Sequence, residues 1–317
     1  MTSIVLIGSR GRAGMYHKKI YTELSIKDIK EVDIGVPNTY SSLNELVQKY
    51  PLERSVIDVC TPTSTHVEII RKAYDHGARR FVVEKPAAFN LAEWRKLVEE
   101  TTDAQYFIIH NYLYSTAFKY ARKFIAKNKW KVVNIHSTFS KDRTKDSISN
   151  RGVSESGIHP HIFQIEMPHQ ISLAIAVLGP IEVTNANCYL EILGNQNLPS
   201  LGHGMVKAKN LEGSTAELHT NLQGETTRSL IIYRNTGESL QIQFATDINL
   251  HSKVTMVTDY SSSKLLFDGY DNSLKNSINC ALLTLNKNKD IPWQSSVKFA
   301  SSILQNIDQA IWQSKIT

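Results

Sequence analysis

The first third of the chain alternates between short apolar runs and amphipathic stretches. Apolar runs of strand length, which are typical of buried parallel strands, lie at residues 3–7, 32–36, 56–60, 80–83 and 104–109. Apolar positions at helical spacing separate them, at residues 13–24, 43–49, 66–76 and 91–100. Strands that alternate with helices predict βαβ units, and right-handed crossovers then give a doubly wound parallel sheet.

The pattern changes after about residue 115. A helix at 117–128 and an alternating strand at 132–140 are followed by a polar loop at 141–157. The next helix is expected from about Phe163 to Leu178, with Pro168 as an alternative start. Alternating runs, typical of a mostly antiparallel sheet with one covered face, lie at 183–192, 214–222, 229–233 and 239–244. A helix at 295–313 closes the chain, so we expect domains at 1–115 and 116–317, with this last helix packing back on the first domain.

Composition narrows the class of protein. The 317 residues are 41% hydrophobic and 21% charged, which suffices for two cores. The chain starts directly with a strand, and its longest apolar run, Ile171 to Leu178, is too short to span a bilayer. Three widely spaced cysteines form no C-x-x-C pair. We therefore expect a cytoplasmic protein of a reducing compartment, without membrane contact, disulfides or a structural metal.

The net charge of +6 is modest and suits an anionic ligand without requiring one. The densest basic stretch, Lys119 to Lys131, has helical spacing and is interpreted as a solvated helix face. No nucleic-acid motif accompanies it, so we expect no nucleic-acid partner.

A glycine-bearing turn follows the first predicted strand. It reads G-x-x-G-x-x-G over residues 8–14, one residue longer than the usual dinucleotide fingerprint between the first two glycines. Glycines let a backbone turn tightly and approach a pyrophosphate at a helix N-terminus. The residues expected to contact the cofactor here are Gly8, Ser9, Arg10, Gly11, Arg12 and Ala13.

At the adenosine end of the expected cofactor site, the sequence departs from the usual dinucleotide-binding pattern. An acid at the end of the second strand generally holds the ribose 2′-hydroxyl, but with the strand placed at 32–36 that position is Pro37-Asn38, and Asp33 falls too early. Arg10 and Arg12 suit a 2′-phosphate, so the pattern favours NADP over NAD, with Asn38 as a contact. The alternative is that both arginines are simply solvated.

Two further strand ends carry polar residues. The third strand leads into a turn with hydroxyl groups that can cap the next helix, contact the cofactor, or do both; its candidates are Thr61, Pro62, Thr63 and His66. The fourth strand ends in Glu84-Lys85-Pro86, where proline stops the ladder and leaves the lysine on the rim of the sheet. Ligands bind at that rim in open α/β sheets, and a half-buried lysine there indicates a charge partner or ligand.

The stretches T-P-T-S-T-H at 61–66, A-Y-D-H-G-A at 73–78 and V-V-E-K-P-A-A at 82–88 resemble the first domain of the Gfo/Idh/MocA oxidoreductases. Gly11, Gly14 and His17 keep that family's relative spacing, and His169 lies ten residues before Gly179, as the family's active-site histidine does. The closing helix is also similar, so the resemblance spans nearly the whole chain.

The resemblance implies a Rossmann domain, a second α/β domain with an open, mostly antiparallel sheet, and a nicotinamide cofactor. It implies that Lys85, often followed by a cis proline, contacts the reacting hydroxyl or carbonyl, and that Glu84 supports the cofactor. His169 would be the general acid/base. The family's substrates are sugars, cyclitols or related polyols, and a homodimer or homotetramer through the C-terminal sheet is expected.

Some positions depart from the family pattern. The aspartate often found four residues before the histidine is Ile165, and Glu166 could replace it; the later aspartate is Ser172. These departures leave the substrate class open.

Four residues near these motifs are candidates for binding the substrate, each with a structural alternative. They are Asn111, Tyr112, His159 and His161. The first two could instead pack where the domains join, and the histidines could instead shape their loop. Metal binding by the two histidines lacks an acidic or cysteine partner at suitable spacing.

The preferred function is an NAD(P)-dependent oxidoreductase acting on a secondary alcohol or ketone of a sugar, amino sugar or cyclitol. Two alternatives stay open. One is a reductase of a non-sugar carbonyl or imine, and the other is a non-enzymatic nucleotide-binding sensor.

Overall fold

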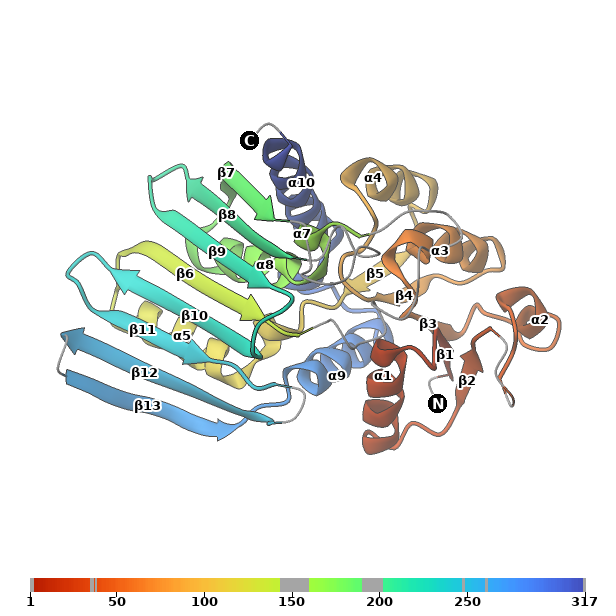
Figure 1. The fold of residues 1–317 in the computed structure, drawn as a ribbon. Coiled ribbons are helices and arrows are strands. Elements are labelled where there is room, and N and C mark those ends of the chain that lie inside the picture. The colour runs from red at the N-terminus through yellow and green to blue at the C-terminus, as the bar shows by residue number, and fades with distance from the viewer. Residues whose placement is uncertain are drawn as a thin grey trace. The chain divides into compact units, whose positions relative to one another are not determined.

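A computed structural model describes residues 3–34, 37, 39–142, 160–189, 202–246, 249–259 and 262–315 (Figure 1). The chain divides into two compact units. The first comprises residues 1–110 and 277–304, and the second comprises residues 111–276 and 305–317.

The first unit is built on a parallel sheet with the strand order β2-β1-β3-β4-β5. Its strands are β1 (Ser3–Ile7), β2 (Ile29–Val32), β3 (Ser55–Val59), β4 (Arg80–Val83) and β5 (Gln105–Ile108). The helices between them are α1 (Arg12–Glu23), α2 (Leu43–Val47), α3 (His66–Asp75) and α4 (Leu91–Glu100), with a 3₁₀ turn η1 (Thr63–Thr65) before α3.

Burial and capping explain why these residues form these elements. Every residue of β3 is buried, as expected for a central parallel strand covered on both faces. Two helices begin at residues whose side chains accept a hydrogen bond from the first turn, Ser42 from Glu45 N and Asn90 from Glu93 N. Because the five strands are parallel, their carboxyl ends lie at one edge of the sheet. The glycine turn and the Glu84-Lys85-Pro86 segment lie at this edge.

The second unit contains a sheet with the order β13-β12-β11-β10-β6-β9-β8-β7. Its strands are β6 (Val132–Ser140), β7 (Ile181–Tyr189), β8 (His203–Asn210), β9 (Thr215–Asn221), β10 (Thr227–Arg234), β11 (Ser239–Gln243), β12 (His251–Asp259) and β13 (Ser262–Tyr270). Among the described strands of this second sheet, β6 and β9 form the one parallel pair, and the other neighbours are antiparallel. Figure 1 shows α5 and α8 together on one side of this sheet.

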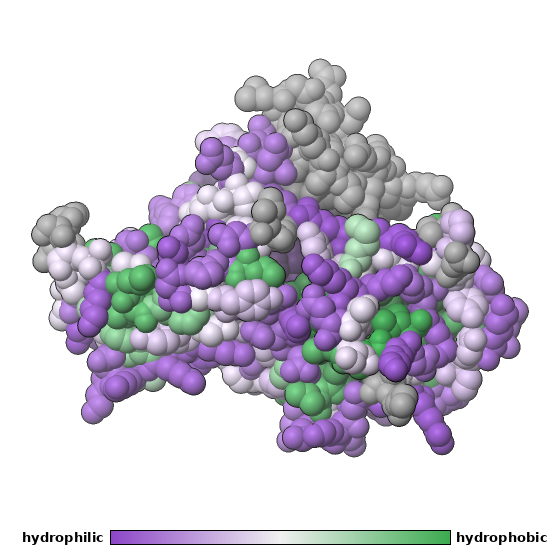
Figure 2. Space-filling view, turned by 90° about the horizontal axis from the view of Figure 1, so that it is seen from below, coloured by the Kyte–Doolittle hydropathy of each residue, from purple (hydrophilic) through white to green (hydrophobic). Residues whose placement is uncertain are grey.

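The remaining elements complete the chain. They are η2 (Asn111–Tyr114), α5 (Thr116–Lys127), α7 (Ile162–Ile165), α8 (Met167–Leu178), α9 (Ser273–Leu285), η3 (Trp293–Ser295) and α10 (Val297–Ser314). Buried and partly exposed residues alternate along β6 and β9, because α8 packs on one face of these strands. Large hydrophobic side chains are exposed at several positions, such as Leu265 on β13. The face drawn in Figure 2 has separate hydrophobic areas among hydrophilic ones.

The predicted fold class is confirmed, a doubly wound parallel sheet and a second, mostly antiparallel sheet. The second strand was placed wrongly, since it ends at Val32 rather than Val36. The helix expected from Phe163 is broken at Glu166 into α7 and α8, and α8 begins at Met167, next to the alternative start at Pro168. Strands β8, β12 and β13 and helix α9 were not predicted. Within the described residues, no helix combines the length and the hydropathy that crossing a membrane requires.

Candidate active site

The glycine turn has the geometry that a pyrophosphate site needs. Gly8 adopts φ +82°, and a Cβ on it would lie 2.9 Å from the carbonyl carbon of Cys60. A Cβ on Gly14 would lie 2.1 Å from Gly8 O, so the start of α1 packs directly against the turn. Gly11 is the N-cap of α1 and supplies no capping side chain, and the first turn holds no acid. The N-terminal amides of α1 are thus available to an anion.

A buried hydroxyl in the same turn supports this interpretation. Ser9 is fully buried, and its Oγ has no hydrogen-bond partner in the described part of the chain. Buried polar groups are rarely unpaired unless a ligand or water completes them. The close glycine contacts and the unpaired hydroxyl together fit a bound dinucleotide.

Asp33 lies next to this turn, contrary to the prediction. Since β2 ends at Val32, Asp33 directly follows the strand, and its Oδ2 accepts a hydrogen bond from Arg10 N at 2.6 Å. Arg10 Nε lies 3.9 Å from Glu31, which also accepts a hydrogen bond from Lys18 Nζ at 2.5 Å. The acid expected at the end of the second strand is therefore present. Asn38, the residue predicted for this role, lies outside the described residues.

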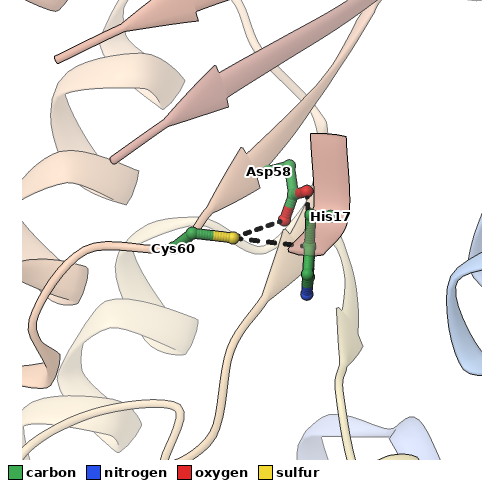
Figure 3. A group of neighbouring side chains, drawn as sticks. All are labelled: His17, Asp58 and Cys60. Atoms are coloured by element: carbon green, nitrogen blue, oxygen red, sulfur yellow. Dashed lines mark hydrogen bonds and ion pairs between the residues drawn. The ribbon is translucent and has the colours of Figure 1, made fainter. Parts of the chain in front are cut away.

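Behind the turn lies a buried network centred on His17 (Figure 3). His17 Nδ1 is 2.7 Å from Asp58 Oδ2, and its Nε2 is 3.0 Å from Glu84 Oε1. Tyr21 donates its hydroxyl to the same Asp58 oxygen at 2.6 Å, and Cys60 Sγ lies 3.4 Å from His17 Nδ1. The network joins α1, the end of β3 and the end of β4. The glycine turn and Glu84 are thereby tied to one charged centre.

The charges in this network follow from its partners. Burial by itself would lower the pKa of His17, but the Asp58 carboxylate and its hydrogen bond raise the pKa well above the ordinary 6.5. His17 is therefore an imidazolium whose two N–H groups point to two carboxylates. Burial, followed by Asp58, raises the pKa of the Cys60 thiol, which stays protonated. The ligand atoms of His17, Asp58 and Cys60 lie within 4.8 Å of one another, and both ring nitrogens of His17 already contact carboxylates.

Lys85 stands at the rim beside this network. The Lys85–Pro86 bond is cis, and Lys85 itself is half-buried. His110, just beyond β5, is fully buried, and burial followed by the charge of Lys85 lowers its pKa to about 3. Neither ring nitrogen of His110 has a hydrogen-bond partner in the described part of the chain. A neutral imidazole thus lies within electrostatic reach of the lysine.

His66 joins the turn after β3 to the segment after β4. Its Nε2 is 2.9 Å from Thr61 O, and its Nδ1 is 3.1 Å from Pro86 O. Burial lowers the pKa of His66, so a neutral ring donates to one carbonyl at a time. Thr61 also accepts a hydrogen bond from Thr65 Oγ1 at 2.9 Å. His66, predicted to contact the cofactor, thus holds the Lys85-Pro86 segment in place.

The other two residues predicted in this turn have less specific surroundings. Pro62 is the N-cap of η1 and exposed, and Thr63 starts that short 3₁₀ turn. Their cofactor contacts stay predictions, as does that of Arg12, whose guanidinium lies 6.0 Å from the ring centre of Tyr16.

In the second unit, His169 is held among aromatic rings on α8. The ring of Tyr112 packs edge-on against it with centroids 4.9 Å apart, and Phe139 of β6 lies at 5.9 Å. Ser172 donates its hydroxyl to His169 O at 2.7 Å. The backbone and ring packing leave the imidazole few orientations, as a proton-transferring group requires. Tyr112, which could have lined a pocket or packed in a core, packs here against the predicted catalytic residue.

Glu166 marks the break between α7 and α8 and is buried. Its Oε2 lies 3.4 Å from Arg228 on β10, and Arg228 also donates to Ser140 O at 2.7 Å. A buried cation beside a buried carboxylate stabilises its charge, and removing either partner is costly. His169 N donates to Glu166 O at 3.2 Å, so Glu166 and its arginine position the helix turn that carries the histidine.

The remaining predicted substrate residues have structural partners. Asn111 Nδ2 donates to Ser273 Oγ at 3.2 Å. His161 is the N-cap of α7, where its Nδ1 accepts from Phe163 N at 3.2 Å, and burial lowers its pKa to about 4. Substrate contacts by these residues stay predictions. His159 lies outside the described residues.

Several residues of the site were not predicted from the sequence. Asp58 and His110 were overlooked, His17 was noted only for its spacing, and Arg228 was not considered. Asp58 and Arg228 are charged residues inside strands, and His110 directly follows the apolar run at 104–109, a pattern that could have indicated buried partners.

The comparison with family models matches residues 3–112 to a model described as "Oxidoreductase family, NAD-binding Rossmann fold", named GFO_IDH_MocA. The resemblance inferred from the sequence is confirmed for this part of the chain. None of the curated proteins matches the chain.

Solved structures share the fold of the whole chain at low identity. Levoglucosan dehydrogenase in complex with NADH and levoglucosan is 14% identical, with a TM-score of 0.78 over 99% of this chain and 97% of that one. UDP-N-acetylglucosamine 3-dehydrogenase GnnA from Acidithiobacillus ferrooxidans is 14% identical, with a TM-score of 0.75 over 99% and 98%. A variant of KijD10, a 3-ketoreductase from Actinomadura kijaniata in complex with TDP-benzene and NADP, is 12% identical, with a TM-score of 0.76 over 98% and 97%.

Proposed function

We propose, because residues 3–112 match the model of the Gfo/Idh/MocA oxidoreductases, that this chain is an NAD(P)-dependent dehydrogenase or reductase. Its substrate is a secondary alcohol or ketone of a sugar, amino sugar or cyclitol. The observation that carries the proposal is the charged network of His17, Asp58 and Glu84, which joins the glycine turn to the segment that presents Lys85. A turn that served only as a connection would not need a buried and a partly buried carboxylate with a histidine between them behind it.

The residues that would hold the cofactor are those of the glycine turn, with Ser9 and the start of α1 at the pyrophosphate. When bound, the nicotinamide supplies or accepts the hydride. Lys85 would polarise the substrate oxygen and stabilise the developing alkoxide. His169 would move the proton, with Tyr112 and Phe139 holding its ring.

Asp33 supports NAD over NADP as the cofactor, which reverses the preference expected from the two arginines. Its carboxylate directly follows β2 and is fixed by Arg10 N. Such an acid accepts hydrogen bonds from ribose hydroxyls and repels a 2′-phosphate. The guanidinium of Arg10 lies beside another acid, with Nε 3.9 Å from Glu31 Oε2.

The first test is to titrate the protein separately with NADH and NADPH, following nicotinamide fluorescence. We expect NADH to bind more tightly, and Asp33→Asn to reduce this difference. Lys30→Gln, which also removes a charge from the β2 region, is the matched control and should leave the ratio unchanged. Binding of neither nucleotide would refute the proposal and favour a sensor with a non-functional turn.

The second test is turnover on a panel of polyols and amino sugars. Lys85→Ala should lower kcat roughly 10²–10³-fold while cofactor affinity stays within a few-fold. Lys96→Ala, an exposed lysine on α4, should behave as the wild type. Normal turnover by Lys85→Ala would remove the lysine from the mechanism, and activity on imines alone would support the non-sugar alternative.

A further inference from the structure

Three side chains that can bind a metal ion project from neighbouring strands of the eight-stranded sheet. His136 lies on β6, and Glu217 and His219 lie on β9. The register of this parallel pair places His136 directly opposite Glu217. Residues two apart on a strand point to the same face, so His219 joins the other two. All three side chains are partly exposed.

Their ligand atoms converge. Glu217 Oε1 lies 2.7 Å from His219 Nε2 and 3.9 Å from His136 Nδ1. The two imidazole rings stack with centroids 4.9 Å apart, and the three ligand atoms all lie within 4.8 Å of one another. Ligands of a tetrahedral zinc ion are roughly 3.3–3.5 Å apart, given bonds of about 2.0–2.2 Å. Small side-chain rotations would therefore suffice to close the site.

The atoms that would not face the ion have neighbours of their own. Thr138 Oγ1 lies 3.4 Å from His136 Nε2, which directs the other nitrogen, Nδ1, towards the carboxylate. The histidines contact Oε1 of Glu217, and the other oxygen, Oε2, lies 3.4 Å from Lys207 Nζ. Such outer partners orient metal ligands in known sites.

We propose that His136, Glu217 and His219 bind a divalent transition-metal ion of the zinc class. Two imidazoles and one carboxylate are donors that suit zinc, and three protein ligands leave a fourth position for water or another ligand. The position opens into a depression of about 510 Å³, lined in part by Thr138 and Asn187. The ion would cross-link β6 and β9, the parallel pair in the described sheet.

This site is separate from the proposed active site. Phe139, which contacts His169, is three residues from His136 on the same strand and therefore points to the opposite face of the sheet. The inference does not depend on the proposed oxidoreductase function. It rests on the register and the distances around Glu217.

The test uses the full, untagged chain, stripped of metal and then dialysed against zinc chloride or titrated with cobalt(II). We expect one ion per chain and, with cobalt, visible bands of a four-coordinate centre. The His136→Ala/His219→Ala double variant should bind zinc at least about tenfold more weakly, and Glu217→Gln should fall between it and the wild type.

His251→Ala is the matched control, because His251 also pairs with a carboxylate, Asp268 at 2.9 Å, in the same sheet. The zinc affinity of the His251→Ala variant should equal that of the wild type. Far-UV circular dichroism identifies any variant that fails to fold, and His219→Asn then takes the place of the double variant. Equal zinc affinity in the wild type and the folded variants would overturn the proposal. A thiolate-to-cobalt band would also overturn it, since it would place the ion at a cysteine.

Discussion

Removing the His17 imidazole should destabilise the first unit strongly. His17 is fully buried and makes two charge-assisted contacts, 2.7 Å to Asp58 and 3.0 Å to Glu84. In His17→Ala, Asp58 stays buried and, within the described residues, keeps only the hydroxyl of Tyr21 and the weak thiol contact of Cys60. Breaking a buried ion pair from one side costs about 3–5 kcal/mol. Two lost charge-assisted hydrogen bonds of about 1.5–3 kcal/mol each lead to a similar value.

Differential scanning calorimetry is the suitable assay, because two compact units need not unfold in one transition. One transition should fall by on the order of 10 °C, while the other keeps its midpoint. His76→Ala, an exposed histidine at the end of α3, should change neither transition. A loss below about 1 kcal/mol would contradict the reasoning, since it would mean that the carboxylates are not ionised or that water replaces the ring.

The same residue predicts a pH dependence. The pKa of His17 is raised in the folded state above its ordinary 6.5, so folding binds a proton above that pH. Its stabilising contribution is complete below pH 6.5 and is lost as the pH rises through the raised pKa. The stability difference between wild type and His17→Ala should therefore shrink from neutral to alkaline pH in denaturation experiments. A difference that grows with pH would show that the ring is neutral.

Two further predictions each compare the same substitution at two positions with different surroundings. Gly8 and Gly213 both have positive φ, but of these two only Gly8 would place a Cβ against nearby backbone. In thermal denaturation, Gly8→Ala should therefore lose at least about 1 kcal/mol more of the free energy of unfolding than Gly213→Ala. Equal losses in the two variants would contradict this. Arg228→Met removes the cation 3.4 Å from the buried Glu166 carboxylate and should cost about 3–5 kcal/mol. Arg234→Met breaks a half-exposed pair and should cost less than about 1 kcal/mol. Similar losses in the two arginine variants, measured by urea denaturation, would mean that the Glu166 site is hydrated.

The parts of the fold that could be predicted are those where burial leaves a periodic pattern. The parallel strands are covered on both faces and appear as continuous apolar runs, as β3 does. The hairpin β12–β13 has no such pattern, because β13 is the edge strand and most of its residues are exposed or half-exposed. The break between α7 and α8 also left no periodic signal, since every residue of α7 and most of α8 are buried. Helix periodicity needs an exposed face to be visible.

For the candidate site, local motifs were predictable and long-range pairs were not. The glycine turn and the Glu84-Lys85-Pro86 segment are each continuous in sequence and lie where strands end. The pairs that connect them, His17 to Asp58 and His17 to Glu84, span 41 and 67 residues. No rule of spacing relates such residues, and only the strand order brings them together.

Asp33 illustrates how a small error in an element boundary changes a chemical conclusion. With the strand placed at 32–36, Asp33 lay inside it, the acid was considered absent, and the two arginines favoured NADP. The parallel pairing of β1 with β2 ends at Ile7 and Val32, so Asp33 follows the strand at the level of the glycine turn. Strand ends are set by pairing with neighbours rather than by local hydrophobicity, and residues 34–36 continue the apolar run beyond the last paired residue. The preference for NAD that we propose therefore depends on where the pairing of β2 with β1 ends, and the sequence around Asp33 alone does not show this.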